Sequence, residues 1–119
     1  MLYRSVQLHD EEESLCWSAC SCRIRPWQWH VGQLHMTTHR LVWLPSAYME
    51  FSFGLPPSLT IDRRAIVRVT EDNSTRLPIW MPLKWMVATT SDRHVFSFGI
   101  FSNQKRKRWL KAIAQWSNQ

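Results

Sequence analysis

Hydrophobic and polar residues alternate along much of the first 100 residues, with the period of two that is typical of β-strands. In the stretch 14–25, the three cysteines fall on one face of the predicted strand and Trp17 falls on the other. Glycine, proline and polar turn residues interrupt the alternation between successive stretches. The pattern predicts strands at residues 14–25, 33–37, 41–44, 48–53, 66–70, 84–90 and 94–101.

The segments between these strands carry turn and loop signals. Residues 27–30 are expected to form a connection, and residues 71–74 and 91–93 are expected to form polar turns. Two prolines within residues 77–82 predict an irregular or edge segment there. Residues 1–13 are interpreted as a further strand or an arm that ends in an acidic turn.

The last 18 residues follow a different period. Trp109, Ile113 and Trp116 are spaced to form one apolar stripe on a helix over residues 102–119. Ser102 is of the residue type that caps helix N-termini. Burial of each of these two tryptophans should contribute about 2–3 kcal/mol, so we expect them to stabilise the fold rather than to bind a ligand.

These elements predict an α+β fold that is mainly β, with a small antiparallel sheet and one C-terminal α-helix. The 119 residues are enough for a single domain over residues 1–119, and a hydrophobic content of 45% with eight tryptophans supplies a core. Only three glycines are present, so neither a P-loop nor a dinucleotide-binding fingerprint fits. Such a module is expected to bind other molecules rather than to catalyse a reaction.

Charge is distributed unevenly along the chain, which has a formal net charge of +6. Four acidic residues occupy positions 10–13, and no acidic residue follows Asp92. A cationic end favours phospholipid headgroups, nucleic acid or an acidic peptide as the partner, and the alternative is a solvated helix face. The basic residues of this end are Lys105, Arg106, Lys107, Arg108 and Lys111.

The sequence also bears on the cellular compartment. No apolar run approaches the ~20 residues of a transmembrane helix, and no signal peptide is evident at the start. An odd number of cysteines within a short stretch indicates reduced thiols. We therefore expect a cytosolic or nuclear protein.

The run from Gly32 to Trp43, Gly-Gln-Leu-His-Met-Thr-Thr-His-Arg-Leu-Val-Trp, resembles the strand pair that is characteristic of GRAM and GLUE domains in the pleckstrin-homology-like superfamily. It is most similar to the GLUE type found in an ESCRT-II subunit. The segment 55–69, with a Leu-Pro pair before Ile61 and Ile66, is similar to the segment that follows in that family. The resemblance implies a barrel of about seven antiparallel strands capped by the helix, and a membrane adaptor in endosomal trafficking. It also implies phosphoinositide binding, ubiquitin binding and a cytoplasmic protein on endosomal or other internal membranes.

This resemblance implies a lipid-binding rim at the open end of the barrel. Arginine is suited to such a site because its planar guanidinium binds two phosphate oxygens. The alternative for each arginine is a surface charge or an internal salt bridge, and Arg40 has the further alternative of binding backbone carbonyls at the strand corner. The candidates for lipid or anion binding are Arg23, Arg25, Arg40, Arg63 and Arg64.

Trp27 and Trp29 are candidates for insertion into a membrane interface, where both the apolar ring and the N–H of an indole are satisfied. The alternative is that the alternation places one of them in the core. No cofactor is expected. The cysteine spacing lacks paired zinc knuckles, and the three thiols of a strand are too far apart for one zinc ion.

The sequence contains neither a nucleophile elbow nor a recognisable carboxylate pair. We therefore expect a non-catalytic module that binds phosphoinositide, a protein partner such as ubiquitin, or both. The alternative is a protein-interaction domain without lipid binding, as in transcription or repair complexes. Nucleic acid is the third-ranked partner, because basic and aromatic residues interleave only at Trp109.

Overall fold

The computed structural model describes residues 6–25, 28–46, 58–72, 85–100 and 102–118, which form seven antiparallel β-strands and one C-terminal α-helix. The predicted mainly β fold class is therefore confirmed. The chain divides into two compact units, Met1–Arg63 and Arg64–Gln119.

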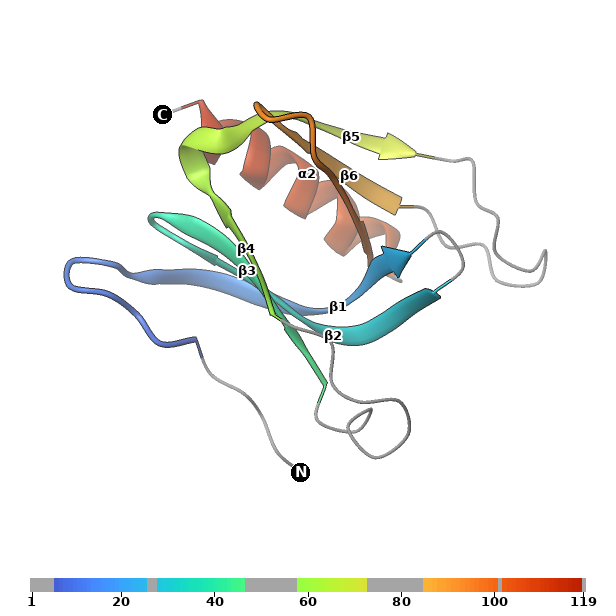
Figure 1. Ribbon diagram of the computed structural model, residues 1–119, viewed down its shortest axis with the longest axis horizontal. Helices are drawn as coiled ribbons and strands as arrows, with labels where there is room; N and C mark the ends of the chain where they lie inside the picture. Colours follow the sequence, from blue (N-terminus) through green and yellow to red (C-terminus); the bar gives the residue numbers. More distant parts are fainter. Residues whose placement is uncertain (1–5, 26–27, 47–57, 73–84, 101, 119) are drawn as a thin grey trace. The chain divides into compact units, whose positions relative to one another are not determined.

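The first unit is an antiparallel meander of four strands: β1 (Ser14–Arg25), β2 (Gln28–Thr37), β3 (Arg40–Pro45) and β4 (Leu59–Asp62). They follow one another in the order β4-β3-β2-β1, as Figure 1 shows. The two-residue alternation of the sequence places one set of side chains in the core. This set includes Cys20, Cys22, Leu34, Met36, Leu41, Trp43 and Ile61.

A tryptophan and a glycine fix the middle of this meander. The Trp43 indole is buried, and its Nε1 donates a hydrogen bond to the Cys20 carbonyl at 3.0 Å. Its ring lies against Gly32, where a Cβ atom would come within 2.8 Å of the ring and would also clash with the Leu44 carbonyl oxygen. Glycine at position 32 is therefore required by the close approach of the ring, which accounts for the first and last residues of the Gly32–Trp43 run.

The second unit contains β5 (Ile66–Asp72), β6 (Trp85–Thr90) and β7 (Val95–Gly99), followed by α2 (Asn103–Ser117). The strands lie in the order β7-β6-β5, and α2 packs against β5 (Figure 1). The 3₁₀ turn η2 (Arg63–Ala65) precedes β5. Trp109, Ile113 and Trp116 are buried, which confirms the predicted apolar stripe.

The local chemistry of α2 also matches the prediction. The Ser102 hydroxyl accepts a hydrogen bond from the Lys105 amide at 3.3 Å, so Ser102 is the N-cap. The predicted turn at residues 91–93 joins β6 to β7, with Arg93 in the left-handed region at φ 69°.

Other boundaries differ from those predicted. Residues 28–30 belong to β2 rather than to a connection, because β1 and β2 stay paired as far as Arg25 and Gln28. Glu71 and Asp72 continue β5, where they pair with Met86 and Trp85, instead of forming a turn. The predicted strand 48–53 and the predicted irregular segment 77–82 lie outside the described residues.

The three cysteines lie on β1 and differ in exposure. Cys16 is exposed, Cys20 and Cys22 are buried, and none of the three forms a disulfide. Burial raises the pKa of the Cys22 thiol to about 12 and also raises that of Cys16. Within the described ranges, no group of three or more His, Cys, Asp or Glu side chains is placed to hold a metal ion. None of the described helices is long and apolar enough to cross a bilayer.

Candidate anion-binding site

The two units differ strongly in charge. The sequence of Arg64–Gln119 holds ten Lys and Arg residues against three Asp and Glu residues, a formal charge of +7. Met1–Arg63 holds five against six, a formal charge of −1. The excess of positive charge of the whole chain therefore belongs to the second unit, and an anionic partner is attracted there.

The outward face of α2 carries much of this charge. Because successive helical residues are rotated by about 100°, Lys107, Arg108 and Lys111 share a face roughly opposite the stripe of Trp109 and Ile113. Lys105 lies four residues before Trp109, so it is on the side of the apolar stripe at the start of the helix, and all four cations are exposed. Among the described residues, none of the four forms an ion pair. We call Lys107, Arg108 and Lys111 the α2 basic face.

Arg106 does not belong to this face, which corrects the prediction from sequence. Its side chain is buried, because position 106 lies on the same stripe as Trp109 and Ile113. Its Nε donates to the Glu71 carboxylate on β5 at 3.2 Å, and its Nη1 donates to the Ile100 carbonyl at 3.4 Å. Arg106 therefore anchors α2 to β5. Its burial could have been predicted from the sequence, because it lies three residues before Trp109 and seven before Ile113, on the same helical stripe.

In the first unit, the guanidinium of Arg40 is already engaged. Its Nε donates to Glu12 Oε2 at 2.9 Å, and its Nη2 donates to Glu12 Oε1 at 3.1 Å and to the Gln7 carbonyl at 2.7 Å. The side chain of Glu12 is fully buried and that of Arg40 is 17% exposed. Arg40 thus forms an internal salt bridge and binds a backbone carbonyl, which are two of the alternatives to anion binding.

Further hydrogen bonds complete the site around the Glu12 carboxylate. The Thr37 hydroxyl donates to Oε2 at 2.6 Å, and the His9 amide donates to Oε1 at 2.9 Å. The hydrogen bonds from Arg40, together with those from Thr37 and His9, lower the pKa of Glu12 to about 2 despite the opposing effect of burial. The carboxylate is therefore ionised across the physiological range. Sequence reasoning interpreted residues 10–13 as one solvated turn and missed this partner.

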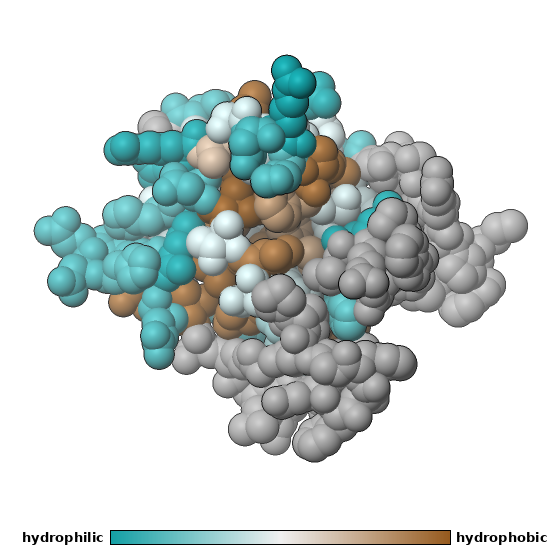
Figure 2. Space-filling model, in the orientation of Figure 1, coloured by the Kyte–Doolittle hydropathy of each residue, from teal (hydrophilic) through white to brown (hydrophobic). Residues whose placement is uncertain are grey.

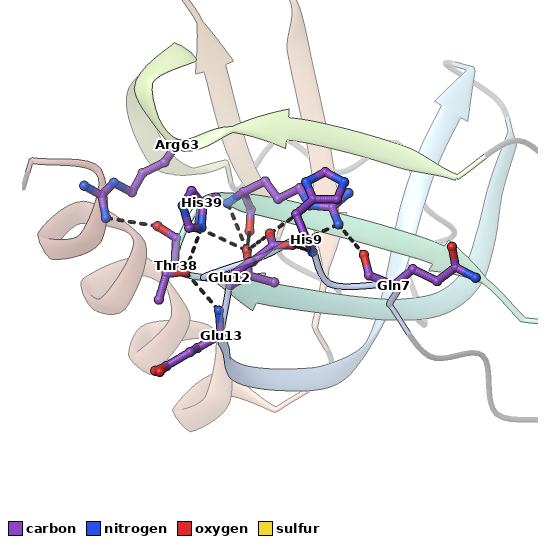
Figure 3. Close-up of polar contacts among 9 residues, drawn as sticks. Gln7, His9, Glu12, Glu13, Thr38, His39 and Arg63 are labelled. Carbon is purple, nitrogen blue, oxygen red and sulfur yellow. Dashed lines mark hydrogen bonds and ion pairs between the residues drawn. The ribbon is translucent and has the colours of Figure 1, made fainter.

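The β2–β3 turn binds the acidic segment along a second line of contacts, which Figure 3 shows. The Thr38 hydroxyl accepts from the Glu13 amide at 3.1 Å, and the Thr38 amide donates to the Glu13 carbonyl at 2.9 Å. Arg63 donates to the Thr38 carbonyl at 3.1 Å. In the space-filling view, the far left, where Figure 1 places the acidic turn, is mostly hydrophilic (Figure 2).

The predicted rim arginines do not form one cluster. Arg40 and Arg63 lie at the β2–β3 turn, whereas Arg23 and Arg25 lie at the opposite end of the β1–β2 pair. The seven residues from Cys16, near that turn, to Arg23 span about 23 Å of strand. Arg23 is half-buried, Arg63 is half-buried and Arg64 is exposed.

The structure describes little of the three remaining predicted site residues, Arg25, Trp27 and Trp29. Arg25 ends β1, and Trp29 lies in β2 opposite Arg23, but neither side chain is among those described. Trp27 lies outside the described residues. The assignment of Trp27 and Trp29 to membrane insertion therefore stays a prediction.

Solved structures of other proteins have a similar architecture. The C-terminal PH domain of human pleckstrin superposes with a TM-score of 0.71 at 18% identity, over 99% of this chain and 92% of that one. The fold is pleckstrin-homology-like. The Vps36 N-terminal PH domain gives a TM-score of 0.68 at 11% identity, covering 94% of this chain and 83% of that chain.

A third structure, the C-terminal domain of an unknown protein from Leishmania infantum, gives a TM-score of 0.64 at 15% identity, over 88% of this chain and 84% of that chain. At these identities the likeness shows a PH-like fold and no finer membership. No family model matches the sequence. No curated protein matches it either.

Proposed function

We propose that this PH-like domain is a non-catalytic interaction module that binds phosphoinositide-containing membranes through the α2 basic face. The observation that carries the proposal is the set of exposed cations on this face, Lys107, Arg108 and Lys111, which form no ion pair among the described residues. Arg106, by contrast, is neutralised inside the unit by Glu71. The cations that remain outward are available to an external anion.

Electrostatics gives the expected strength of such binding. Each Lys or Arg close to an anionic lipid surface contributes about 1 kcal/mol, so the three cations of this face contribute roughly 3 kcal/mol at low salt. The attraction falls off within a Debye length of about 8 Å at physiological ionic strength. Binding by this face should therefore be peripheral, reversible and strongly dependent on salt.

Sedimentation with liposomes tests the proposal. We expect the domain to pellet with phosphatidylcholine vesicles that contain about 5% phosphatidylinositol bisphosphate, and to be released when the salt is raised from about 0.1 M to 0.5 M. Vesicles of phosphatidylcholine alone are the control and should leave the domain in the supernatant. The double variant Lys107→Glu/Lys111→Glu should lose most of the binding.

A charge-matched variant on the same unit separates the α2 basic face from other cations. Arg64→Glu/Arg68→Glu makes the same change of charge on exposed residues outside the helix. If the helix variant binds like the wild type and the Arg64/Arg68 variant does not, the α2 proposal is wrong and the predicted rim is supported. Circular dichroism of both variants shows whether the fold is retained.

The finer parts of the functional prediction are carried by the sequence resemblance alone. They are ubiquitin as the protein partner, a role in endosomal trafficking and a location on endosomal or other internal membranes. Titration of ¹⁵N-labelled domain with ubiquitin tests the first, and unchanged spectra at millimolar ubiquitin would exclude it. Imaging of a fluorescent fusion tests the location.

A second candidate function, a protein-interaction domain without lipid binding, is favoured by a different observation. Leu15, Trp17 and Val31 are large apolar side chains exposed on the first unit. If the domain pellets with none of the vesicles but still binds a peptide, this second function is supported.

A further inference from the structure

An exposed apolar surface lies on β1 and β2 of the first unit. Trp17 is 55% exposed, Leu15 is 49% exposed and Val31 is 50% exposed. The strand register pairs Trp17 with His35 and Ser21 with Val31, which places Trp17 and Val31 on one face of the two strands. Leu15 lies two residues before Trp17, at the register shift between Ser14 and Cys16. The four residues from Trp17 to Ser21 span about 13 Å. We call Leu15, Trp17 and Val31 the Trp17 surface.

The indole of Trp17 is held in place although it is exposed. It stacks on the His35 imidazole with ring centroids 5.9 Å apart and an interplanar angle of 19°. Nε2 of His35 lies 3.1 Å from the Gln33 amide oxygen, which fixes the imidazole in turn. An exposed tryptophan that is already ordered loses little side-chain entropy on binding, and tryptophan is enriched among the residues that dominate binding energy.

The charge next to this surface is negative. Asp10, Glu11 and Glu13 are exposed, and Glu13 is two residues from Leu15. This acidic turn does not move freely, because the buried Glu12 between Glu11 and Glu13 is bound by Arg40 and Thr37. Glu13 is itself held through its backbone by Thr38. Fixed negative charges therefore stand at one end of an exposed apolar strip.

We infer that the Trp17 surface is a docking site for a protein segment that carries apolar side chains with lysines or arginines clustered at one end. The apolar residues of the segment cover Leu15, Trp17 and Val31, and its cations face Asp10, Glu11 and Glu13. Charge complementarity selects this partner: an acidic segment is repelled, and a neutral apolar segment gains nothing from the acidic turn. The site is independent of the α2 basic face, which attracts the opposite charge.

A defined pair of peptides tests this inference with the intact domain. The probe is a fluorescein-labelled peptide of about 14 residues, with an apolar stretch of leucine and isoleucine followed by four lysines, and the matched control replaces the lysines with glutamates. We expect the lysine peptide to bind in fluorescence anisotropy and to shift the amide and indole resonances of Trp17. The glutamate peptide should bind at least about tenfold more weakly.

Two test variants and one control variant locate the site. Trp17→Ala should weaken binding of the lysine peptide by at least about tenfold, whereas Val67→Ala, which removes an exposed apolar side chain from β5, should leave it unchanged. Glu11→Gln/Glu13→Gln should weaken it by about threefold and reduce its salt dependence. Both positions are exposed, so circular dichroism should show an intact fold.

Three outcomes would overturn the inference. They are equal binding of the two peptides, unchanged binding by Trp17→Ala, and concentration-dependent self-association that Trp17→Ala abolishes. The last, seen by light scattering, would make the surface a contact between copies of the chain. Lipid binding by α2 is measured in a separate experiment. Each proposal can therefore be refuted without affecting the other.

Discussion

Replacement of Glu12 by glutamine should destabilise the first unit, because it removes the charge from a buried ion pair. Glu12 accepts hydrogen bonds from Arg40, Thr37 and the His9 amide, and its side chain is fully buried. Glutamine keeps the shape of the side chain. It leaves the Arg40 guanidinium, which is 17% exposed, without its carboxylate partner.

The magnitude follows from the pKa of the carboxyl group. A lowering from 4.5 to about 2 corresponds to roughly 3 kcal/mol of stabilisation of the ionised form. Arg40 retains some contact with solvent, which screens the pair, so we expect Glu12→Gln to lower the free energy of unfolding by about 2 kcal/mol at pH 7. Urea denaturation followed by circular dichroism measures this difference.

The pH dependence provides an independent check. The pKa of Glu12 is lower in the folded than in the unfolded state, so its stabilisation is complete above about pH 5 and is lost as the pH falls toward 2. The difference in unfolding free energy between the wild type and Glu12→Gln should therefore shrink steadily over that window. Glu13→Gln, a neighbouring exposed carboxyl group, is the matched control and should change stability by less than about 0.5 kcal/mol. The reasoning is refuted if Glu12→Gln is as stable as the control, or if its acid curve runs parallel to that of the wild type.

Three further contacts can be tested by substitution and urea denaturation. Gly32→Ala places a methyl group against the Trp43 ring and the Leu44 carbonyl and should cost about 2 kcal/mol, and an unchanged midpoint would show that the ring is not held there. Arg106→Met removes the ion pair with Glu71 and should cost about 2 kcal/mol, whereas Arg108→Met on the exposed face should cost less than about 0.5 kcal/mol. Equal effects would contradict the burial of Arg106. Ser102→Ala should cost about 1 kcal/mol through loss of the N-cap and Ser102→Asp should not, so equal losses would argue against capping.

Local periodicity predicted most of the fold. The alternation of 14–25 and the stripe of Trp109, Ile113 and Trp116 are confirmed as β1 and α2, because each pattern depends on neighbouring residues in the chain. Residues 28–30 were missed because their strand state depends on pairing with the end of β1, which the residues themselves do not encode.

The environment of single charges was predicted less well. The charge block 105–108 was predicted to form one basic helix face, yet Arg106 is buried because it lies on the helical stripe of Trp109 and Ile113. Arg40 was a candidate for anion binding, with an internal salt bridge as the alternative, and the structure shows the salt bridge, to Glu12, 28 residues earlier in the chain. A pairing over that separation depends on the tertiary fold, which brings the β2–β3 turn next to the acidic turn. No local sequence pattern predicts it.

The unequal burial of the β1 thiols has a practical consequence for chemical labelling. Cys22, with a pKa near 12, stays protonated and enclosed, and Cys20 is enclosed as well, so alkylating reagents should reach neither while the domain is folded. Cys16 is the accessible thiol and stands beside Trp17 in the sequence. A spin label or fluorophore attached through maleimide at mildly alkaline pH should therefore report on that stretch of the strand without mutation of the native cysteines.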